Sequence, residues 1–346
     1  MTQKLKQIIV HIGLPRIIIA GFLLVIFITA YITDMSVPQL ITDSLVRVGM
    51  NGILVLAMVP TISCGVGLNF GLPLGVLSGL VGALISMERG LAGFPGLFAA
   101  IGFAVPIAVV VGYLYALLLE SVKGQEMMVG TYVGFSAVAV MCIFWLMAPF
   151  KNPELIWAIG GKGLRFTLTL GNHFGKVLNN FAVFKLFGVK ISGGLLGFFL
   201  LFCLLIYLFY KTKLGIAMVA AGANPVFARS AGIDVRHMKA VGVILSTVLA
   251  AIGIIVYAQS YGFLQLYMAP LMMAFPAVAA ILIGGASLQK ATISNVIIGT
   301  VLFQTLLTTA LPVTSRVIQG DISEVARLII SNGMILYALT RSTGGQ

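Results

Sequence analysis

Long apolar runs follow one another along almost the whole chain, separated by short polar or glycine-rich stretches. Residues 17–33 (IIIAGFLLVIFITAYIT) and 194–210 (GLLGFFLLFCLLIYLFY) contain no charged side chain. A helix needs roughly 20 apolar residues to cross about 30 Å of hydrocarbon, and both runs approach that length. The pattern predicts an all-α integral membrane protein with about ten transmembrane helices. Their expected cores are 17–33, 44–62, 72–87, 97–119, 129–149, 193–210, 240–258, 266–286, 292–311 and 325–340.

The composition supports this class. Apolar residues make up 60% of the 346 positions and charged residues only 9%, whereas soluble domains carry about 25% charged residues. The net charge of +12 does not indicate nucleic-acid binding, because basic residues in membrane proteins usually mark cytoplasmic loops and lipid headgroup contacts. The three cysteines match neither a metal motif nor a disulfide framework. They are expected to be small packing residues.

The distribution of basic residues predicts that both termini are cytoplasmic. With that orientation the short outside segments hold four arginines, and the short inside segments hold eleven lysines and arginines, as the positive-inside rule expects. The inside set is Lys4, Lys6, Arg16, Lys123, Lys211, Lys213, Arg229, Arg236, Lys239, Lys290 and Arg341. Residues 150–192 are expected to pack as an external cap. Their own basic residues oppose that location, and an odd number of preceding spans would place them inside.

The segment 211–239 (KTKLGIAMVAAGANPVFARSAGIDVRHMK) contains a short helix signal. Asn224 is a good cap and Pro225 suits the first helical position. A short helix over 226–231 would then end at Gly232, in the usual place for a terminating glycine. Such a helix, with Phe227 on its apolar side, fits two roles. It is either a structural element in the lipid headgroups or a knob that inserts into a partner protein.

The pattern from Gly222 to Lys239, G-A-N-P-x-x-A-R-x-A-G-I-x-V-x-x-x-K, resembles the coupling segment of ribose-, galactose- and xylose-type permeases. These are subunits of bacterial ABC importers that depend on a solute-binding protein. The short turn VKG at 122–124 resembles the turn before the family's fifth span. Residues 279–288 (AAILIGGASL) resemble its glycine-rich segment late in the chain. The order and spacing agree over roughly residues 40–340.

The resemblance implies a single transmembrane permease domain over 1–346, with 211–239 as its cytoplasmic coupling segment. It implies a bacterial inner-membrane importer of a monosaccharide or a related ring compound such as a nucleoside. The expected partners are ATP-binding cassette subunits that hold ATP-Mg, an extracytoplasmic solute-binding protein, and a second permease, more plausibly a paralogue than an identical copy. The residues expected to dock into the cassette are Gly222, Asn224, Pro225, Phe227, Ala228, Arg229, Gly232 and Ile233.

Residues 65–75 (GVGLNFGLPLG) interrupt an apolar region, and irregular backbone at membrane depth often lines a cavity. The related family has an acidic residue where this chain has Asn69, which points to a different substrate or to one half of a heterodimer. A simple packing break is the alternative. The candidate pathway residues are Asn51, Asn69, Phe70, Phe275 and Gln304, although helix–helix hydrogen bonding would explain the polar ones equally well. Gly284, Gly285 and Ser287 are expected to serve packing or a gate.

No phosphate-binding loop is present. The nearest string, GNHFGK at 171–176, is one residue short of the motif and is followed by Val177. The chain itself is therefore expected to bind no nucleotide. Its three histidines, His11, His173 and His237, are scattered among different loops and no nucleophile–base pair is present, so it is also expected to hold no cofactor or metal and to be no enzyme. An ion-driven secondary transporter is the main alternative. The nine acidic residues lie mostly at span ends or in loops, which argues against it, but a charged residue in the central cavity would favour it again.

Overall fold

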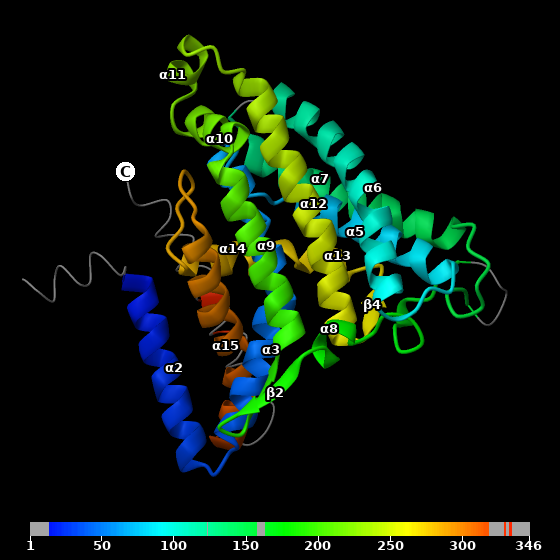
Figure 1. The fold of residues 1–346 in the computed structure, drawn as a ribbon, viewed down its shortest axis with the longest axis vertical. Helices are drawn as coiled ribbons and strands as arrows, with labels where there is room; N and C mark the ends of the chain where they lie inside the picture. Colours follow the sequence, from blue (N-terminus) through cyan, green and yellow to red (C-terminus); the bar gives the residue numbers. More distant parts are fainter. Residues whose placement is uncertain (1–13, 123, 158–162, 318–328, 330–331, 334–346) are drawn as a thin grey trace, which may run out of the picture.

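The computed structural model describes residues 14–122, 124–157, 163–317, 329 and 332–333, which form an elongated helical bundle (Figure 1). Its helices are α2 (Leu14–Ile32), α3 (Val37–Leu56), α4 (Met58–Ser63), α5 (Leu72–Glu88), α6 (Gly93–Ser121), α7 (Glu126–Met147), α8 (Val177–Asn180), α9 (Gly193–Lys211), α10 (Lys213–Ala223), α11 (Pro225–Ser230), α12 (Val235–Tyr261), α13 (Ala269–Met272), α14 (Ala274–Ile283) and α15 (Ile293–Val317). Its strands are β1 (Thr167–Thr169), β2 (Val183–Leu186), β3 (Val189–Ser192) and β4 (Phe263–Gln265).

The helices agree with an all-α membrane protein. Within the described residues, six helices are long and apolar enough to cross a bilayer: Val37–Ser63, Gly93–Ser121, Glu126–Met147, Gly193–Lys211, Val235–Tyr261 and Ile293–Arg316. Shorter apolar helices cover Arg16–Ile32, Leu72–Glu88, Lys213–Ala223 and Ala269–Ile283. The count of about ten spans and the side of each terminus therefore stay predictions. The expected core 325–340 and both chain ends lie outside the described residues, apart from residues 329 and 332–333.

The expected helix break near residues 65–75 is present. Because Pro60 has no N–H for the carbonyl of Leu56, the long helix bends at Ala57, between α3 and α4. Residues 64–71 are then irregular, with positive φ at Gly65 (78°) and Gly67 (94°). Glycine adopts these angles without the steric cost of a side chain.

The expectation of one continuous helix over 266–286 is wrong. The chain instead leaves β4, forms the single turn α13, and restarts as α14. Pro270 lies at the start of α13 and Pro276 in the first turn of α14, where a missing N–H costs least. The two prolines therefore divide what hydropathy reads as one span.

A second difference concerns residues 211–239, where α10 was not expected. Thr212 caps this helix, since its hydroxyl oxygen accepts a hydrogen bond from Gly215 N at 3.2 Å. Its buried residues Gly215, Met218 and Ala221 are spaced three apart, so they form one face of the helix. The sequence of small and apolar residues favours a helix but lacks the strong periodicity that would have predicted it.

The centre of the bundle is built on α5 and α12. Helix α5 packs on α6 and α12, α12 also packs on α3, and α15 lies against α3 and α14. Gly75 and Gly79 place α5 directly on the α12 backbone: a side chain at either position would collide with the carbonyl oxygen of Thr247 or Ala251. Small residues allow this close approach.

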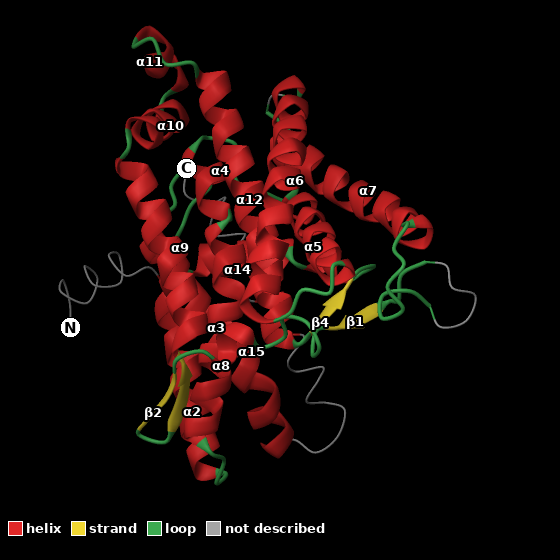
Figure 2. Ribbon diagram, turned by 45° about the vertical axis from the view of Figure 1, so that its right-hand side comes forward, coloured by secondary structure: helices red, strands yellow, loops and turns green. Residues whose placement is uncertain are grey.

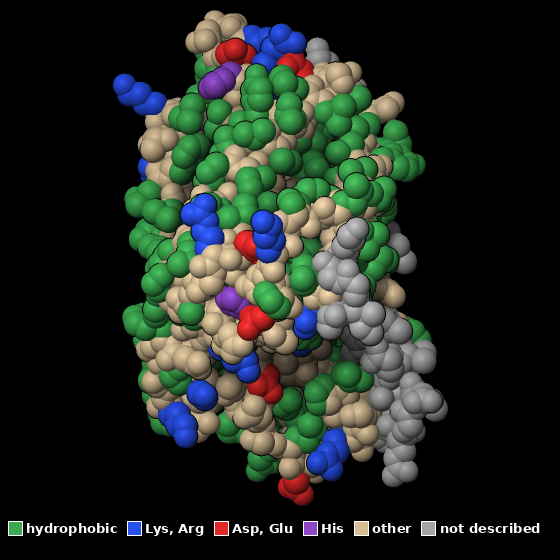
Figure 3. Space-filling model, turned by 90° about the vertical axis from the view of Figure 1, so that its right-hand side faces the viewer, with side chains coloured by type: hydrophobic (Ala, Val, Ile, Leu, Met, Phe, Trp, Pro, Cys, Tyr) green, Lys and Arg blue, Asp and Glu red, His purple; other side chains and the backbone are tan. Residues whose placement is uncertain are grey.

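The outward faces of α6, α7 and α9 carry large exposed apolar side chains, including Val110, Leu114, Val140 and Leu200, which are 52–64% exposed. A space-filling view shows a largely hydrophobic band between charged groups at one end and charged groups further down (Figure 3). Acyl chains would cover such a band in a bilayer.

The end of the bundle opposite α11 carries residues 150–157 and 163–192 (Figure 1). Here β1 pairs antiparallel with β4, which follows α12, and β2 pairs antiparallel with β3 to form a hairpin (Figure 2). The Asn172 amide and the His173 ring both hydrogen-bond to the Glu154 carboxylate, which holds the pKa of that carboxyl below its ordinary value. The segment is thus folded onto the helix ends, and its external location stays a prediction.

Candidate functional site

The short helix expected in the coupling segment is α11. The Asn224 side chain accepts a hydrogen bond from Phe227 N at 3.0 Å, and Pro225 occupies the first turn. The chain then leaves the helix through Gly232, at a φ of +78°, and Ile233 N bonds back to the Ala228 carbonyl at 2.9 Å. The capping residues therefore form the helix that the sequence predicts, one residue earlier at each end.

Helix α11 lies at the extreme end of the molecule, beyond α10 (Figure 1; Figure 2). Val226 and Phe227 point outward and are 76% and 64% exposed. Ala228 is fully buried, in a small cluster that includes Met218 of α10 and Met238 of α12. One face of α11 is thus anchored to the bundle, while a bulky aromatic side chain is left uncovered on the other.

Ion pairs join the segment after α11 to the ends of α6 and α7. Arg236 pairs with Glu120 at the end of α6, and Lys239 Nζ lies 3.7 Å from Glu126 Oε1 at the start of α7. These groups line a cavity of ≈530 Å³ that Arg229 also lines. Within the described residues Arg229 makes no ion pair. A movement of α11 that shifts the start of α12 would therefore reach two further long helices, α6 and α7.

Helix α10 also connects α11 to the irregular segment 64–71. Gly222 lies so close to this segment that a side chain there would collide with the carbonyl oxygen of Ser63. A cavity of ≈1070 Å³ lies beside this contact, lined by residues of α10, of the segment 63–67 and of the loop 288–294. The α11 end therefore reaches the irregular segment 64–71 through the backbone contact of α10, and it reaches α6 and α7 through the ion pairs of α12.

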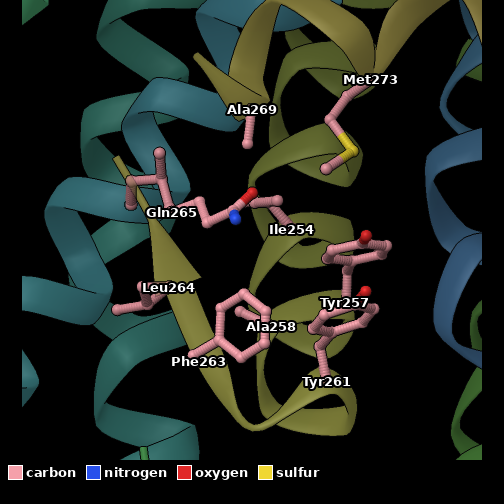
Figure 4. Close-up of a pocket in the computed structure, with 10 residues that line it drawn as sticks. Ile254, Tyr257, Ala258, Tyr261, Phe263, Leu264, Gln265, Ala269 and Met273 are labelled. Carbon is pink, nitrogen blue, oxygen red and sulfur yellow. The ribbon is translucent and has the colours of Figure 1, made fainter. Parts of the chain in front are cut away.

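A separate cavity of ≈410 Å³ lies between α3, α12, the α13–α14 segment and α15. It contains two of the expected pathway residues, Asn51 from α3 and Gln304 from α15. A smaller cavity of ≈60 Å³ adjoins it and shares Tyr257, Gln265 and Met273. Figure 4 shows the Gln265 amide pointing into this space from β4, opposite Tyr257 and Tyr261 of α12. Amides, aromatic rings and methionines together can hold a small solute with both polar and apolar faces.

A family model described as "Branched-chain amino acid transport system / permease component" matches residues 40–339. The chain belongs to this family. The match confirms the resemblance to ABC permeases of the branched-chain amino acid and monosaccharide superfamily. Neither the comparison with curated proteins nor that with solved structures returned a match.

The other expected pathway residues of this permease lie elsewhere. Phe70 and Phe275 contact each other, with ring centroids 5.9 Å apart, and neither lines the cavity that contains Asn51 and Gln304. The five candidates therefore do not form one site. Asn51 and Gln304 share a cavity, Phe70 and Phe275 contact each other, and Asn69 belongs to neither pair.

Asn69 sits in a buried hydrogen-bond network and is only 2% exposed. Its amide donates to Ser246 Oγ at 2.8 Å, its carbonyl oxygen accepts from Tyr115 OH at 3.4 Å, and Ser246 Oγ donates to the Ala57 carbonyl at 2.6 Å. The network joins the broken helix to α6 and α12 at the bend of α3. This geometry supports the packing alternative for Asn69.

Replacing Asn69 with alanine is expected to reduce the stability of the permease by about 1–3 kcal/mol, because Tyr115 and Ser246 lose a buried partner. Asn51→Ala is the control: the Asn51 amide bonds only to the Arg47 carbonyl of its own helix, so its loss should change stability by about 0.5 kcal/mol or less. Thermal unfolding in detergent measures both. Equal unfolding temperatures for the two variants would contradict the structural role of Asn69.

The expected packing segment 284–287 joins α14 to α15. Gly284 faces Asn295 and Gly299, and the Arg16 guanidinium donates to the Gly284 carbonyl. Gly285 has a φ of +82°. Ser287 Oγ accepts hydrogen bonds from the backbone of Gln289 and Lys290 at 3.4 and 3.0 Å, which closes a tight turn. The contacts are those of helix packing, and a gating role stays a prediction.

Sequence reasoning missed several groups at the two adjoining cavities: Arg47, Tyr257 and Gln265 at the larger one and Tyr261 at the smaller one. Arg47 could have been found, because it precedes Asn51 by four residues and therefore lies on the same face of α3. The other three come from the end of α12 and from β4, which an apolar span followed by a turn did not single out. Their convergence depends on the pairing of β4 with β1.

Proposed function

We propose that this permease is the membrane-spanning subunit of an ABC importer, which moves a small solute into the cytoplasm with energy from separate ATP-binding cassette subunits. The observation that carries the proposal is α11, a capped helix fixed on one side and exposing Phe227 on the other, within a chain of this permease family. A partner with an apolar cleft would bury Phe227 and offer Arg229 acidic or carbonyl groups.

The charges at the α11 end favour a cytoplasmic location for it. The described basic residues on or beside α10 and α11 are Lys211, Lys213, Arg229, Arg236, Lys239 and Lys290, against the acidic Glu120, Glu126 and Asp234. An excess of lysine and arginine marks the cytoplasmic side. The segment 150–192 would then face outward, in position to receive an extracytoplasmic solute-binding protein.

The mechanism follows from the contacts of α10 and α12, the two helices that flank α11 in the chain. ATP-Mg bound by the cassettes would draw them together and displace α11. Because Arg236 and Lys239 pair with Glu120 and Glu126, the displacement would pass to α6 and α7. The contact of Gly222 with Ser63 would pass it to the broken helix. Rearrangement of these elements would change which side of the membrane the cavity between α3, α12 and α15 faces.

The solute is proposed to be a monosaccharide or a related ring compound such as a nucleoside. A cavity of ≈410 Å³ is large enough for one ring compound, and amide and tyrosine side chains line it. We further propose that a second permease completes the pathway. A paralogue is favoured over an identical copy because this chain has Asn69 where related permeases carry an acid.

An ion-driven carrier is the alternative, and one observation bears on it: Arg47 lines the cavity. An arginine keeps its proton at any physiological pH and so cannot carry one across the membrane. Residues that do so are aspartate, glutamate or histidine, and none of these lines this cavity within the described part of the chain. Arg47 therefore gives an ion-driven mechanism little support.

The test is to co-express the tagged permease with its cassette and partner subunits after replacing Phe227 and Arg229 with glutamate. The double variant is expected to lose most of its bound cassette and its ATP-driven uptake, because two new charges would enter an apolar cleft. Phe187→Glu is the matched control: Phe187 is 94% exposed, at the tip of the β2–β3 hairpin, far from α11.

The control should retain the cassette. Undiminished co-purification and uptake in the double variant would contradict the docking of α11. Loss of the cassette in both variants would show only that the subunit tolerates no new surface charge, and a Phe227→Leu variant, which keeps an apolar side chain, would then decide. Retained assembly in Phe227→Leu together with loss in Phe227→Glu supports docking, and equal loss in both contradicts it.

A further inference from the structure

The cavity between α3, α12 and α15 is lined by a polar side chain that has no hydrogen-bond partner among the described residues. Gln304 is only 4% exposed, and within the described residues its side-chain amide makes no hydrogen bond, although it lines the cavity. The amide therefore faces the cavity rather than another side chain. A solute or ordered water that enters the cavity would satisfy it, so Gln304 marks the cavity as a place where a polar ligand is held.

Arg47 is the one charged side chain that lines this cavity in the described part of the chain. Its guanidinium lies 5.6 Å from the centroid of the Tyr261 ring, and the Tyr257 and Tyr261 rings stack at 5.6 Å with an angle of 11°. The nearest acid on the same helix, Asp43, accepts a hydrogen bond from Gln39 and makes no ion pair with Arg47. The charge is thus held beside the cavity by an aromatic surface.

The groups around the cavity indicate what kind of solute it can hold. Gln265 and Asn51 add two further amides beside Gln304, and the stacked tyrosines offer an aromatic face next to the cation. Such a set suits a solute that presents hydrogen-bonding groups and a ring. A cationic solute would meet an unopposed like charge, whereas an anionic group would find a partner.

We propose that Arg47 is the charge-selecting residue of the solute cavity, so that the cavity admits uncharged or anionic ring-bearing solutes and disfavours cationic ones. This proposal rests on the proposed function only in calling the ligand a transported solute. The selection itself is a property of the cavity in the isolated chain. It assigns to Arg47, Gln304 and the Tyr257–Tyr261 pair a role in specificity, separate from the docking role of α11.

The experiment uses small thiol reagents of similar size and different charge as probe solutes. Asn51 is replaced by cysteine in a full-length chain whose three native cysteines are changed to alanine, and the protein is placed in lipid nanodiscs. Modification rates are measured with methanethiosulfonates that carry a 2-sulfonatoethyl, a 2-hydroxyethyl or a 2-(trimethylammonio)ethyl group. Each reagent's rate is divided by its rate with free cysteine, so that intrinsic reactivity cancels.

The normalised rates for the thiol at position 51 are expected to fall in the order anionic, neutral, cationic. Arg47→Gln should lower the ratio of anionic to cationic rates about tenfold, because a unit charge within about 6 Å acts on the two reagents in opposite directions. Arg47→Lys, which keeps the charge, should restore the preference. At Ser230→Cys, an exposed control position on α11, Arg47→Gln should leave the ratio unchanged.

Two results would overturn the proposal. One is a ratio at position 51 that Arg47→Gln does not change, which would leave Arg47 as a contact for lipid headgroups. The other is a thiol at this position that no reagent reaches, which would mean that small solutes do not enter this cavity. Neither result involves a cassette, so failure here is distinguishable from a failure of α11 to dock.

Discussion

Gly299→Ala is expected to destabilise the permease more than any other single methyl group added to its helices. A Cβ at this position would collide with the carbonyl oxygen of Ala280 and lie 2.8 Å from the backbone nitrogen of Gly284. Both obstacles are backbone atoms of the α14 end, so no flexible side chain can move aside. Overpacking of this kind typically costs about 1–3 kcal/mol and sometimes more.

The matched control is Gly102→Ala on α6, where an added Cβ would meet no heavy atom within 4 Å. Alanine is favoured over glycine in a helix by about 1 kcal/mol, so this variant should be as stable as the parent or slightly more so. The apparent melting temperature of the purified protein, at one scan rate, compares the two. If the Gly299→Ala and Gly102→Ala variants have the same melting temperature, the close contact between α14 and α15 is not present in the folded protein.

Gly222→Val is expected to abolish ATP-driven uptake while much of the fold persists. Gly222 is the last but one residue of α10 and lies against residues 63–65. A Cβ there would collide with the Ser63 carbonyl oxygen and lie 2.8 Å from Gly65 N. Valine would push the end of α10, and α11 with it, away from residues 63–65. A displacement of α11 by the cassettes would then no longer be passed on to residues 63–65.

Ala223→Val supplies the comparison, because Ala223 is the next residue and is exposed. It adds two methyl groups to the same helix end without entering the contact. Uptake into proteoliposomes that contain the complete transporter is expected to fall by at least about tenfold for Gly222→Val, the equivalent of roughly 1.4 kcal/mol. It should change little for Ala223→Val. Equal uptake by both variants would show that the Gly222 contact does not pass the movement of α10 and α11 to residues 63–65.

Local rules explain which parts of the fold the sequence could predict. Helix α11 was predicted nearly to the residue, because Asn224, Pro225 and Gly232 act through their own backbone positions and need no distant contact. The apolar cores of α6, α9 and α12 were predicted for a similar reason, since membrane insertion depends on local composition. Residues 266–286 were misjudged because hydropathy does not register what two prolines do to the backbone.

The sites were harder to predict, because they depend on contacts between distant segments. Asn51 and Gln304 were chosen separately as polar groups in apolar spans, and only the packing of α3 on α15 shows that they share a cavity. Asn69 belongs to the same class of residue, yet its neighbours Tyr115 and Ser246 place it in a packing network. Polarity within a span signals that a partner exists but does not say whether the partner is protein or solute.

The central claim is that α11 is the point of contact with an ATP-binding subunit. The most direct measurement places the photoreactive residue benzoylphenylalanine at position 227 of the complete transporter, with position 187 as the control, and identifies the cross-linked chain. Illumination at position 227 is expected to give a covalent adduct with the cassette subunit, and position 187 should give none. A cross-link from position 227 to lipid alone, with the cassette still bound to the complex, would contradict the account.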